Sequence, residues 1–280
     1  MKKFILCADG FGKSKDHNRA VLNGSNSGFI KSASIVANGE AFDTAINDII
    51  PECPNISVGI NLNITDGASL TPCFKLVDIN HKFKHNFYSL LGLIKQDKTA
   101  LEEIETEFRA QIEKIISYTK VFHVNSAANV HLIPEVFSIT CKLAKEYNIS
   151  YIRTHNEELY YVPDFKHIIN LKYFAGIYKI LKYNKYYRED KVITKEYGLK
   201  TSDYSIGTAY KSFMDSKSLE YGLKTLSDED NILVECSIEP CSYLRNINNP
   251  RSLEFKMSQD RFLEDTVSRL GYEITNHKNI

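Results

Sequence analysis

The stretch that decides the fold runs from His123 to Pro134 and reads His-Val-Asn-Ser-Ala-Ala-Asn-Val-His-Leu-Ile-Pro. A run rich in β-forming residues, Val121 to Val124, leads into it, and Pro134 suits the first turn of a helix. A polar loop between a strand and a helix is typical of the carboxyl end of a barrel strand, where such folds place their chemistry. The stretch therefore predicts a site on a framework of alternating strands and helices.

The rest of the chain continues this alternation. Apolar runs predict strands at 4–8, 34–37, 56–62, 121–124, 150–153, 231–237 and 272–274. Apolar residues at helical spacing and capping signals predict helices at 17–28, 40–50, 100–118, 134–147 and 260–270. Loops with short helices are expected at 68–100, and helical excursions at 158–200. These alternating units predict an α/β fold, a single distorted (β/α) TIM-like barrel that forms one domain over residues 1–280.

Composition narrows the classes of function. The chain has 280 residues, is 43% hydrophobic and carries 35 basic and 35 acidic residues, so its formal net charge is zero. This balance gives no reason to expect a nucleic-acid or membrane partner. The six cysteines form no Cys-x-x-Cys pair, which predicts free buried thiols in a reducing compartment. The first apolar run stops at Asp9, too short for a secretory signal, and no apolar run reaches about 18 residues, so we expect a cytoplasmic protein.

Polar side chains gather where the predicted strands end. In a parallel barrel these ends converge, so groups from different strands meet in one pocket. The clusters are Asp9 with Gly10, Asn61 with Asn63, His123 to His131 with Asn125 and Asn129, Arg153 to Glu157 with His155, and Glu235 to Glu239. Their convergence predicts a functional site.

Each cluster also has a plainer, structural interpretation. Asp9 fits a turn or cap residue. Asn61 and Asn63 fit loop residues that satisfy backbone groups. His123 and His131 lie between apolar neighbours and fit hydrogen-bonded core histidines.

Two further features remain open in the same way. Arg153 fits either a site residue or a structural ion pair with Glu157. The segment 158–200, rich in tyrosine and lysine, fits either a surface that packs on the barrel or a face that contacts a substrate or partner. Only the joint pattern of strand ends favours a functional site.

The motifs are similar to those of the YdjC-like family of carbohydrate deacetylases. Ala8-Asp9-Gly10-Phe11-Gly12 resembles the family's opening Ala-Asp-Asp-Phe-Gly, and Val58 to Gly67 resembles its Val-Gly-x-His-Leu-x-Leu-Thr-x-Gly. His123 to Pro134 resembles its His-x-x-Ser-His-Gln-His-x-His-x-x-Pro. Later blocks with this resemblance are Tyr151 to Arg153 with Glu157, Tyr204 to Gly207, Leu233 to Glu235, and Arg251 with Glu254. The blocks keep their order along nearly the whole chain, so the resemblance implies the family's fold.

The resemblance also implies a divalent metal, which the family holds with one aspartate and two histidines. Here the aspartate position is Gly10, the first histidine position is Asn61, and the second falls within Ala127 to Asn129. The family's late His-Pro-Gly, which carries a catalytic histidine, aligns with Glu239-Pro240-Cys241. The retained positions are Asp9, which corresponds to the family's general base, with His131, Arg153 and Glu235.

This departure changes the expected chemistry. A metal lowers the pKa of bound water from ~15.7 to ~7, whereas a general base such as Asp9 alone contributes ~10² to ~10⁴-fold. We therefore expect no metal and no cofactor. The predicted function is binding or processing of an N-acetylated or related sugar in polysaccharide or glycan metabolism, without the family's metal-dependent hydrolysis.

The predicted site residues fall into two groups. The catalytic candidates are Asp9, His131 and Glu239; the substrate-binding candidates are Asn61, Asn63, Asn125, Asn129, Arg153, His155 and Glu235. The expected partner is a small-molecule sugar or nucleotide sugar, and a homodimer is left open. Three alternatives stand beside this hypothesis: a metal-free enzyme that modifies a sugar or nucleotide sugar, a deacetylase with a metal site rearranged around His123, His131 or His155, and a structural scaffold.

Overall fold

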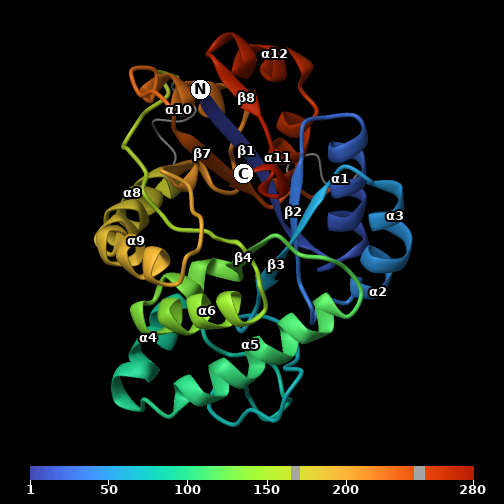
Figure 1. Ribbon diagram of the computed structural model, residues 1–280, viewed down its shortest axis with the longest axis vertical. Coiled ribbons are helices and arrows are strands. Elements are labelled where there is room, and N and C mark those ends of the chain that lie inside the picture. The colour runs from blue at the N-terminus through green and yellow to red at the C-terminus, as the bar shows by residue number, and fades with distance from the viewer. Residues whose placement is uncertain (165–170, 243–249) are drawn as a thin grey trace.

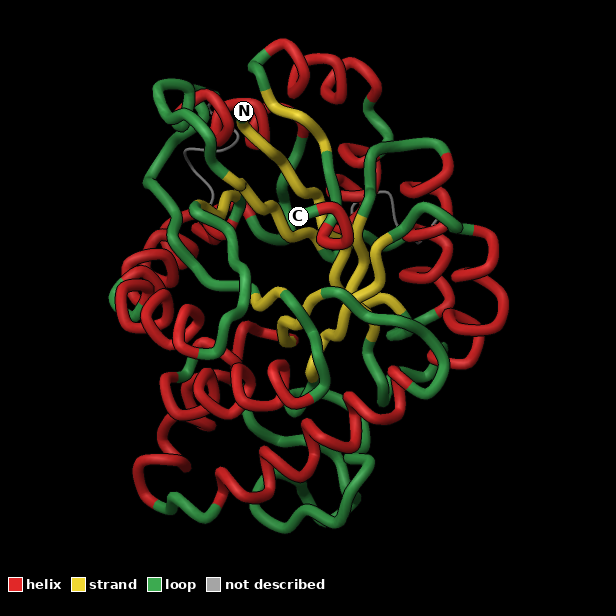
Figure 2. Tube along the Cα trace, viewed as in Figure 1, coloured by secondary structure: helices red, strands yellow, loops and turns green. Residues whose placement is uncertain are grey.

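A parallel β-sheet forms the centre of the molecule, and helices cover its outside (Figures 1 and 2). The computed structural model describes residues 1–164, 171–242 and 250–280. The strands are β1 (Lys2–Phe11), β2 (Ser32–Ile35), β3 (Ser57–Leu62), β4 (His123–Ser126), β5 (Tyr151–Ile152), β6 (Tyr204–Ile206), β7 (Leu233–Ile238) and β8 (Tyr272–Ile274). Their order is β5-β4-β3-β2-β1-β7-β6, and β8 pairs with β1. All these pairs are parallel, which confirms the α/β barrel architecture.

The barrel is open between β5 and β6. The two strands share no ladder among the described residues, but a single parallel bridge joins Tyr151 to Lys200. The Ser205 N–H also donates to the Asn156 carbonyl at 2.7 Å. The sheet therefore curves almost around, and its carboxyl edge still brings several strand ends together.

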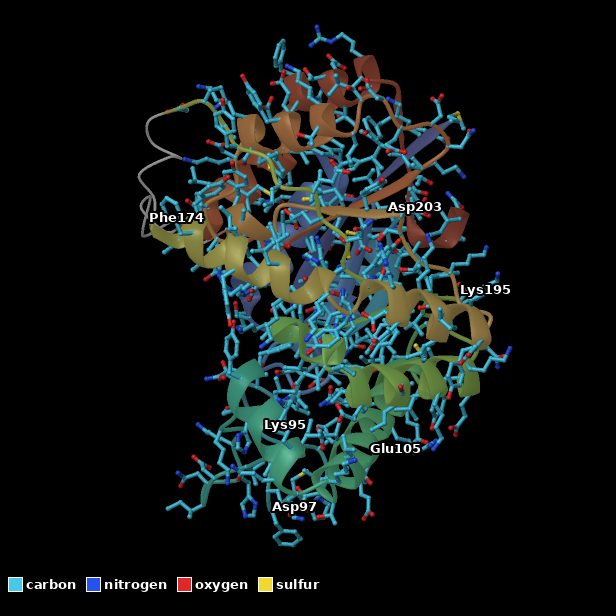
Figure 3. The ribbon with its side chains drawn as sticks, turned by 90° about the vertical axis from the view of Figure 1, so that its left-hand side faces the viewer. Lys95, Asp97, Glu105, Phe174, Lys195 and Asp203 are labelled. Carbon is cyan, nitrogen blue, oxygen red and sulfur yellow. The ribbon has the colours of Figure 1, made fainter. Side chains whose placement is uncertain are left out.

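The helices lie in the connections between the strands. They are α1 (Lys15–Asn26), α2 (Phe42–Thr44), α3 (Ile50–Glu52), α4 (Phe87–Gln96), α5 (Ala100–Ile116), α6 (Pro134–Glu146), α8 (Leu171–Asn184), α9 (Tyr187–Glu196), α10 (Ser216–Thr225), α11 (Pro250–Ser258) and α12 (Arg261–Arg269). A π-helix, η1 (Ala45–Ile49), joins α2 to α3, and the 3-10 turns are η2 (Ala127–Leu132), η3 (Thr208–Tyr210) and η4 (His277–Asn279). In Figure 3, α8 and α9 cross the view from Phe174 to Lys195.

Helix α5 shows why the apolar pattern predicts the fold. Ile104, Phe108, Ile112 and Ile115 recur at helical spacing, and all four are fully buried. Burial of each such side chain contributes about 1.5–3 kcal/mol. The predicted helix at 100–118 is therefore confirmed, with its last residues in a turn that follows the helix.

Strand β4 begins two residues later than the sequence predicts. The apolar run suggested 121–124, but the ladder spans His123–Ser126 because Ile60, Asn61 and Leu62 of β3 pair with Val124, Asn125 and Ser126. The polar residues Asn125 and Ser126 thus belong to the strand. Apolar alternation could not locate this end, because the side chains that face the barrel interior here are polar.

Several elements escaped prediction. Strand β6 and helices α10 and α11 were not expected, and the predicted helix at 40–50 is divided by the π-turn η1. Helix α10 begins with a capping box, in which the Asp215 side chain accepts from the Ser218 N–H and the Ser218 hydroxyl accepts from the Asp215 N–H. The third helical residue is serine and not the glutamate or glutamine of the usual motif, so the sequence does not mark this helix start clearly.

Two predictions about the chain as a whole can be compared with the structure. All six cysteines are buried, and none of them forms a disulfide, as expected. Within the described ranges, no helix is long and apolar enough to cross a membrane.

Candidate functional site

Asp9 lies at a bulge near the carboxyl end of β1. The register between β1 and β2 shifts between Ala8 and Phe11, and Gly10 in this bulge has φ of 77°. Positive φ is easily adopted by glycine, and bulges re-aim side chains next to sites. The Asp9 carboxylate is 6% exposed and faces the barrel interior, so the alternative that it merely caps a turn is not supported by its contacts.

Four hydrogen bonds occupy the Asp9 carboxylate. Its Oδ1 accepts from the Ser34 hydroxyl, the Asn125 amide and the Arg153 guanidinium, each at 3.0 Å. Its Oδ2 accepts from Arg153 at 2.9 Å. A carboxylate offers about four lone-pair sites, so these contacts leave little capacity for a water nucleophile.

Arg153 links Asp9 to Glu235. Its Nε donates to Glu235 Oε1 at 2.8 Å, and the Tyr151 hydroxyl donates to Glu235 Oε2 at 2.7 Å. Burial opposes the charge of Arg153, but the two carboxylates outweigh it and raise the pKa of the guanidinium well above its usual value. Burial likewise disfavours ionisation of Glu235, yet the neighbouring Arg153 charge holds its pKa well below the usual range. The three groups form a buried, charged network.

An asparagine pair extends this network across the sheet. Asn61 on β3 faces Asn125 on β4 in register, and its Nδ2 donates to Asn125 Oδ1 at 2.7 Å and to Ser34 Oγ at 3.3 Å. Among the described residues, none donates to the side-chain carbonyl oxygen of Asn61. This side chain also lines the cavity described in the next paragraph. We define the polar floor as Asp9, Ser34, Asn61, Asn125, Arg153 and Glu235. The structure thus brings together five of the ten predicted site residues.

A cavity of about 620 Å³ opens above the polar floor. This volume lies within the range of small-molecule sites. Its lining includes polar side chains, aromatic rings and cationic side chains, among them Asp9, Asn61, Asn63, Asn129, Glu239, Phe87, Tyr88, Tyr183, Lys13, Lys179, Lys211 and Arg251. Such a mixture offers apolar faces and hydrogen-bonding groups to one ligand.

The loop after β4 forms part of the cavity wall in an unusual conformation. Ala128 and Asn129 have φ of 52° and 55°, and both line the cavity. Two consecutive non-glycine residues in the left-handed region cost of order 1–3 kcal/mol each. Asn129 tolerates this conformation better than Ala128. The loop is therefore held in place by its surroundings, and it presents Asn129 to the cavity.

Glu239 occupies the space beside Gly10. A Cβ at position 10 would lie 3.2 Å from Glu239 Cγ and 3.5 Å from its Oε1. Glu239 forms an ion pair with Arg251 and lies 3.5 Å from Lys13 Nζ and 3.6 Å from His17 Nε2. Burial raises its pKa, but the hydrogen bond with His17 and the cationic neighbours outweigh burial and leave the pKa well below the usual value. Its surroundings therefore favour the ionised carboxylate, and the catalytic role of Glu239 stays a prediction.

His131 is enclosed by the protein. It is fully buried, its Nδ1 lies 2.6 Å from the Ser126 hydroxyl, and its Nε2 lies 3.1 Å from the Arg153 carbonyl. Burial and the Arg153 charge lower its pKa to about 3. The residue does not line the cavity, and these contacts tie the loop after β4 to the strand that carries Arg153.

Two other predicted residues also have structural contacts. The Asn63 side chain holds its own turn through Thr65, Asp66 and Asn38, although it lines the cavity. His155 lies 2.8 Å from the Thr208 hydroxyl and 3.1 Å from Asn184 Oδ1. Their contribution to substrate binding stays a prediction.

The alternative pairing of Arg153 with Glu157 is wrong. Arg153 pairs with Asp9 and Glu235 instead. Glu157 accepts from the backbone N–H groups of Gly207 and Thr208 at 2.9 and 3.0 Å. The short spacing between Arg153 and Glu157 suggested that they pair. In the folded barrel, the carboxylates of Asp9 and Glu235 lie beside the guanidinium instead, although they are distant in sequence.

The residues present do not fit the metal that the resemblance implies. Gly10 and Ala127 offer no donor, and the Asn61 amide nitrogen already donates to Asn125 and Ser34. Structural and catalytic zinc sites use imidazole, thiolate or carboxylate ligands. No step of the chemistry is therefore derived through a metal at these positions.

One other group of potential ligands lies deeper in the barrel. Over residues 1–164, 171–242 and 250–280, Cys7, His123 and His277 form the one group of at least three cysteine, histidine or acidic side chains with ligand atoms within 4.8 Å of one another. The two imidazoles are stacked, with centroids 3.8 Å apart and planes inclined by 22°. Imidazole lone pairs lie in the ring plane, so stacked rings do not direct both at one ion. His123 is thus a core histidine here.

Sequence reasoning missed several residues of the site. Ser34 ends β2 beside Asp9, and the rule of converging strand ends could have found it. Tyr151 precedes Arg153 on its strand but points to Glu235. Lys179 and Lys211 line the cavity from α8 and from the residue after η3. No short motif marks either lysine.

The fold and the site define an open α/β barrel with a polar cavity at the carboxyl ends of its strands. The chain belongs to the family described as YdjC-like protein, whose profile matches residues 3–267.

Comparison with individual proteins agrees with this family. The chain is 34% identical over 166 residues to a carbohydrate deacetylase of Clostridium beijerinckii, a match that covers 56% of this chain and 63% of the relative. It is 34% identical over 158 residues to carbohydrate deacetylase 1 of Listeria innocua, covering 55% and 62%. The match thus spans less than two thirds of either relative's length.

A solved structure from Enterococcus faecalis V583, described as a cellobiose-phosphate cleavage protein, shares the fold. Its TM-score is 0.76 at 18% identity, over 99% of this chain and 98% of that one. This likeness concerns the architecture alone.

Proposed function

We propose that the protein binds an N-acylated carbohydrate in the cavity above the polar floor and does not hydrolyse it by a metal-dependent route. The proposal rests on a contrast between the polar floor and the expected metal positions, which all lie at the strand ends. Hydrogen bonds link the side chains of the polar floor. The three positions that would hold the metal are occupied instead by Gly10, by Asn61 and by the loop 127–129. Similarity to carbohydrate deacetylases supports a sugar as the ligand.

The cavity lining suits a sugar. The Asn61 carbonyl and the Asn129 amide offer an acceptor and donors for hydroxyl or acetamido groups, and both residues line the cavity. Phe87 and Tyr183, whose ring centroids are 5.4 Å apart, supply an apolar wall. Sites of this kind combine apolar surface with a few placed polar groups.

The same geometry disfavours hydrolysis by the remaining acids. Asp9 Oδ1 accepts three hydrogen bonds within the floor and Oδ2 accepts one, and cations hold the pKa of the Glu239 carboxyl well below its usual value. A water molecule without a metal has pKa ~15.7 and needs strong activation. We infer that, without a metal, these two acids do not together activate water and protonate a leaving amine.

Binding can be tested with the untreated and the EDTA-treated protein. We expect N-acetylglucosamine oligosaccharides to bind equally well in both, measured by isothermal titration calorimetry. Asn61→Ala should weaken binding about fivefold, because one hydrogen bond is worth about 1 kcal/mol. Asn156→Ala is the matched control, because Asn156 donates to the Asp203 carbonyl and does not line the cavity. Equal affinity of Asn61→Ala and the unaltered protein would count against the proposal.

Restoring the ligands tests the loss of metal chemistry. The variant combines Gly10→Asp, Asn61→His and Ala127→His. Aspartate tolerates the positive φ at position 10 better than most residues, although Glu239 must move aside. Metal-dependent release of acetate by this variant, with none from the unaltered protein, is the expected result. Acetate release by the unaltered protein with added metal would refute the proposal.

A second candidate, metal-free modification of a sugar or nucleotide sugar, rests on the contact between His17 and Glu239 beside Gly10. This pair places an imidazole next to an ionised carboxylate close to the cavity. Mass spectrometry of a bound sugar after prolonged incubation tests it. A covalently changed sugar, lost with His17→Asn, would favour this candidate over simple binding.

A further inference from the structure

Two lysines on one wall of the cavity form no close ion pair. Among the other cations on the lining, Arg251 pairs with Glu239, Lys13 lies between Asp66 and Glu239, and Lys172 lines the cavity from α8. Lys179 and Lys211 line the same cavity, and no described carboxylate lies within 4.0 Å of either ammonium group. We call Lys179 and Lys211 the cationic wall.

The fold brings these two lysines together through a close contact of helix and turn. Helix α8 packs on η3, and a Cβ at Gly176 would lie 2.4 Å from the Ala209 Cα. Only glycine permits this approach. Lys179 follows Gly176 by about one helical turn and Lys211 follows Ala209 by two residues, so both side chains border the same space.

The backbone beside Lys211 is fixed by a buried carboxylate. Glu254 accepts from the Ser212 N–H at 2.7 Å and from the Glu239 N–H at 2.8 Å. Ser212 has φ of 75°, a conformation that serine adopts rarely. This bridge ties the two loops that carry Lys211 and Glu239 to one another and holds the cationic wall in position.

The charge of Lys211 acts on the carboxyl groups of Glu239 and Glu254 from beyond ion-pair distance, whereas Lys179 interacts with Lys211. Burial lowers the pKa of Lys179, and the positive charge of Lys211 lowers it further. Lys179 is exposed at the cavity and Lys211 is half-buried, and a bound anion would reduce the repulsion between their like charges. Phosphate and carboxylate groups are the ordinary partners of such ammonium groups.

We propose that the cationic wall binds a negatively charged group of the carbohydrate, a phosphate or a uronate carboxylate, while the neutral ring occupies the space above the polar floor. This inference rests on the proposed carbohydrate binding and names the class of sugar. Arg153 is not counted in the cationic wall, because its charge is already matched by Asp9 and Glu235.

The experiment compares three sugars on one protein. N-acetylglucosamine, its 6-phosphate and glucuronic acid are titrated by calorimetry at low and at high salt. We expect at least one acidic sugar to bind about tenfold more tightly than the neutral one, with the advantage falling at high salt. Preference for the phosphate or for the carboxylate then identifies the group.

Variants test whether Lys179 and Lys211 cause the preference for the acidic sugar. Lys179→Gln with Lys211→Gln should abolish the preference for the acidic sugar and leave the affinity for N-acetylglucosamine within about twofold. Lys185→Gln is the matched control, because Lys185 is an exposed lysine just after α8 that does not line the cavity. In the unaltered protein, the acidic sugar should also raise the pKa of Lys179, followed by NMR of its side-chain nitrogen.

Each outcome has a distinct meaning. Binding of the neutral sugar with no gain from the charged group would overturn the cationic wall and leave carbohydrate binding intact. A preference that survives in the double lysine variant would also overturn it. Failure of all three sugars to bind would overturn the proposed function itself.

Discussion

The polar floor and the cationic wall face the same cavity, but they differ in how their charges are matched. On the floor, Arg153 meets Asp9 and Glu235 with three hydrogen bonds, and every partner is buried. On the wall, Lys179 and Lys211 have no carboxylate within 4.0 Å among the described residues. A matched, buried network stabilises one arrangement of the chain, whereas unmatched groups at a cavity remain available for a ligand.

The difference separates charged groups that pair with one another from charged groups that form no close ion pair. Asp9 and Arg153 keep their identities in the resemblance to the family, and here they form a buried ion pair. In the proposed function, the ligand contacts come from Lys179, which lies outside the motifs, and from the Asn61 side-chain carbonyl, at a motif position where the family has histidine. Four measurements test this difference between the polar floor and the cationic wall.

The largest expected effect is on the floor. Asp9→Asn keeps the size of the side chain but leaves Arg153 with Glu235 as its one carboxylate. We expect a loss of about 3 kcal/mol in the free energy of unfolding, because removal of one partner of a buried ion pair leaves charge uncompensated. Urea denaturation measures it. Glu220→Gln, at an exposed pair with Lys224, is the control and should cost less than about 1 kcal/mol.

A loss in Asp9→Asn no greater than in Glu220→Gln would contradict the view of the floor as a structural network. It would mean that the buried charges are matched without Asp9. The role of Asp9 would then have to be sought in ligand binding.

The next effect concerns pH and the loop after β4. His131 in the folded protein has its pKa lowered to about 3, whereas an unfolded histidine titrates near ~6.5. Below ~6.5 the unfolded chain binds the extra proton, so this stabilisation is complete at higher pH and is lost as the pH falls toward 3. At pH 5 the loss is about 2 kcal/mol.

The pH dependence of unfolding checks this expectation. His131→Asn should be less stable at pH 7, and its free energy of unfolding should decline less steeply between pH 6.5 and 5. Parallel pH curves for the two proteins would show that His131 is not the buried neutral histidine described here.

A smaller effect, of opposite sign, is expected in the loop 127–129. Ala128 has φ of 52°, which costs an L-residue with a Cβ roughly 1–2 kcal/mol. Ala128→Gly should therefore stabilise the protein by up to about 1 kcal/mol in thermal or urea unfolding. Ala127→Gly is the matched control and should destabilise by about 0.5–1 kcal/mol, because Ala127 has no positive φ.

The smallest effect separates the wall from the floor. Lys179→Gln should leave the free energy of unfolding within about 0.5 kcal/mol of the unaltered protein, because the lysine makes no ion pair that folding would lose. A marked loss of stability would show that the wall, like the floor, is part of the structural network.

The sequence predicted the fold and the floor for one physical reason. Parallel strands carry their polar residues to a shared edge, so Asp9, Asn61, Asn125, Arg153 and Glu235 could be expected to meet there, and they do. The resemblance to the family placed the same residues in order along the chain.

The rest could not be predicted because it depends on tertiary contacts. The pairing of Arg153 with Asp9 spans 144 residues, and no local spacing indicates it. Lys179 reaches the cavity through the packing of Gly176 on Ala209, which joins two segments without a recognisable motif. The conformation of Ala128 depends on its surroundings and is not evident from an alanine.

The central claim is that the cavity binds a carbohydrate without metal-dependent hydrolysis. The most direct measurement follows one sample of protein and N-acetylglucosamine oligosaccharide by calorimetry and by proton NMR for acetate, first with EDTA and then with added zinc. The account predicts the same affinity in both conditions and no acetate in either. Acetate that accumulates only with zinc, or an oligosaccharide that binds in neither condition, would contradict it.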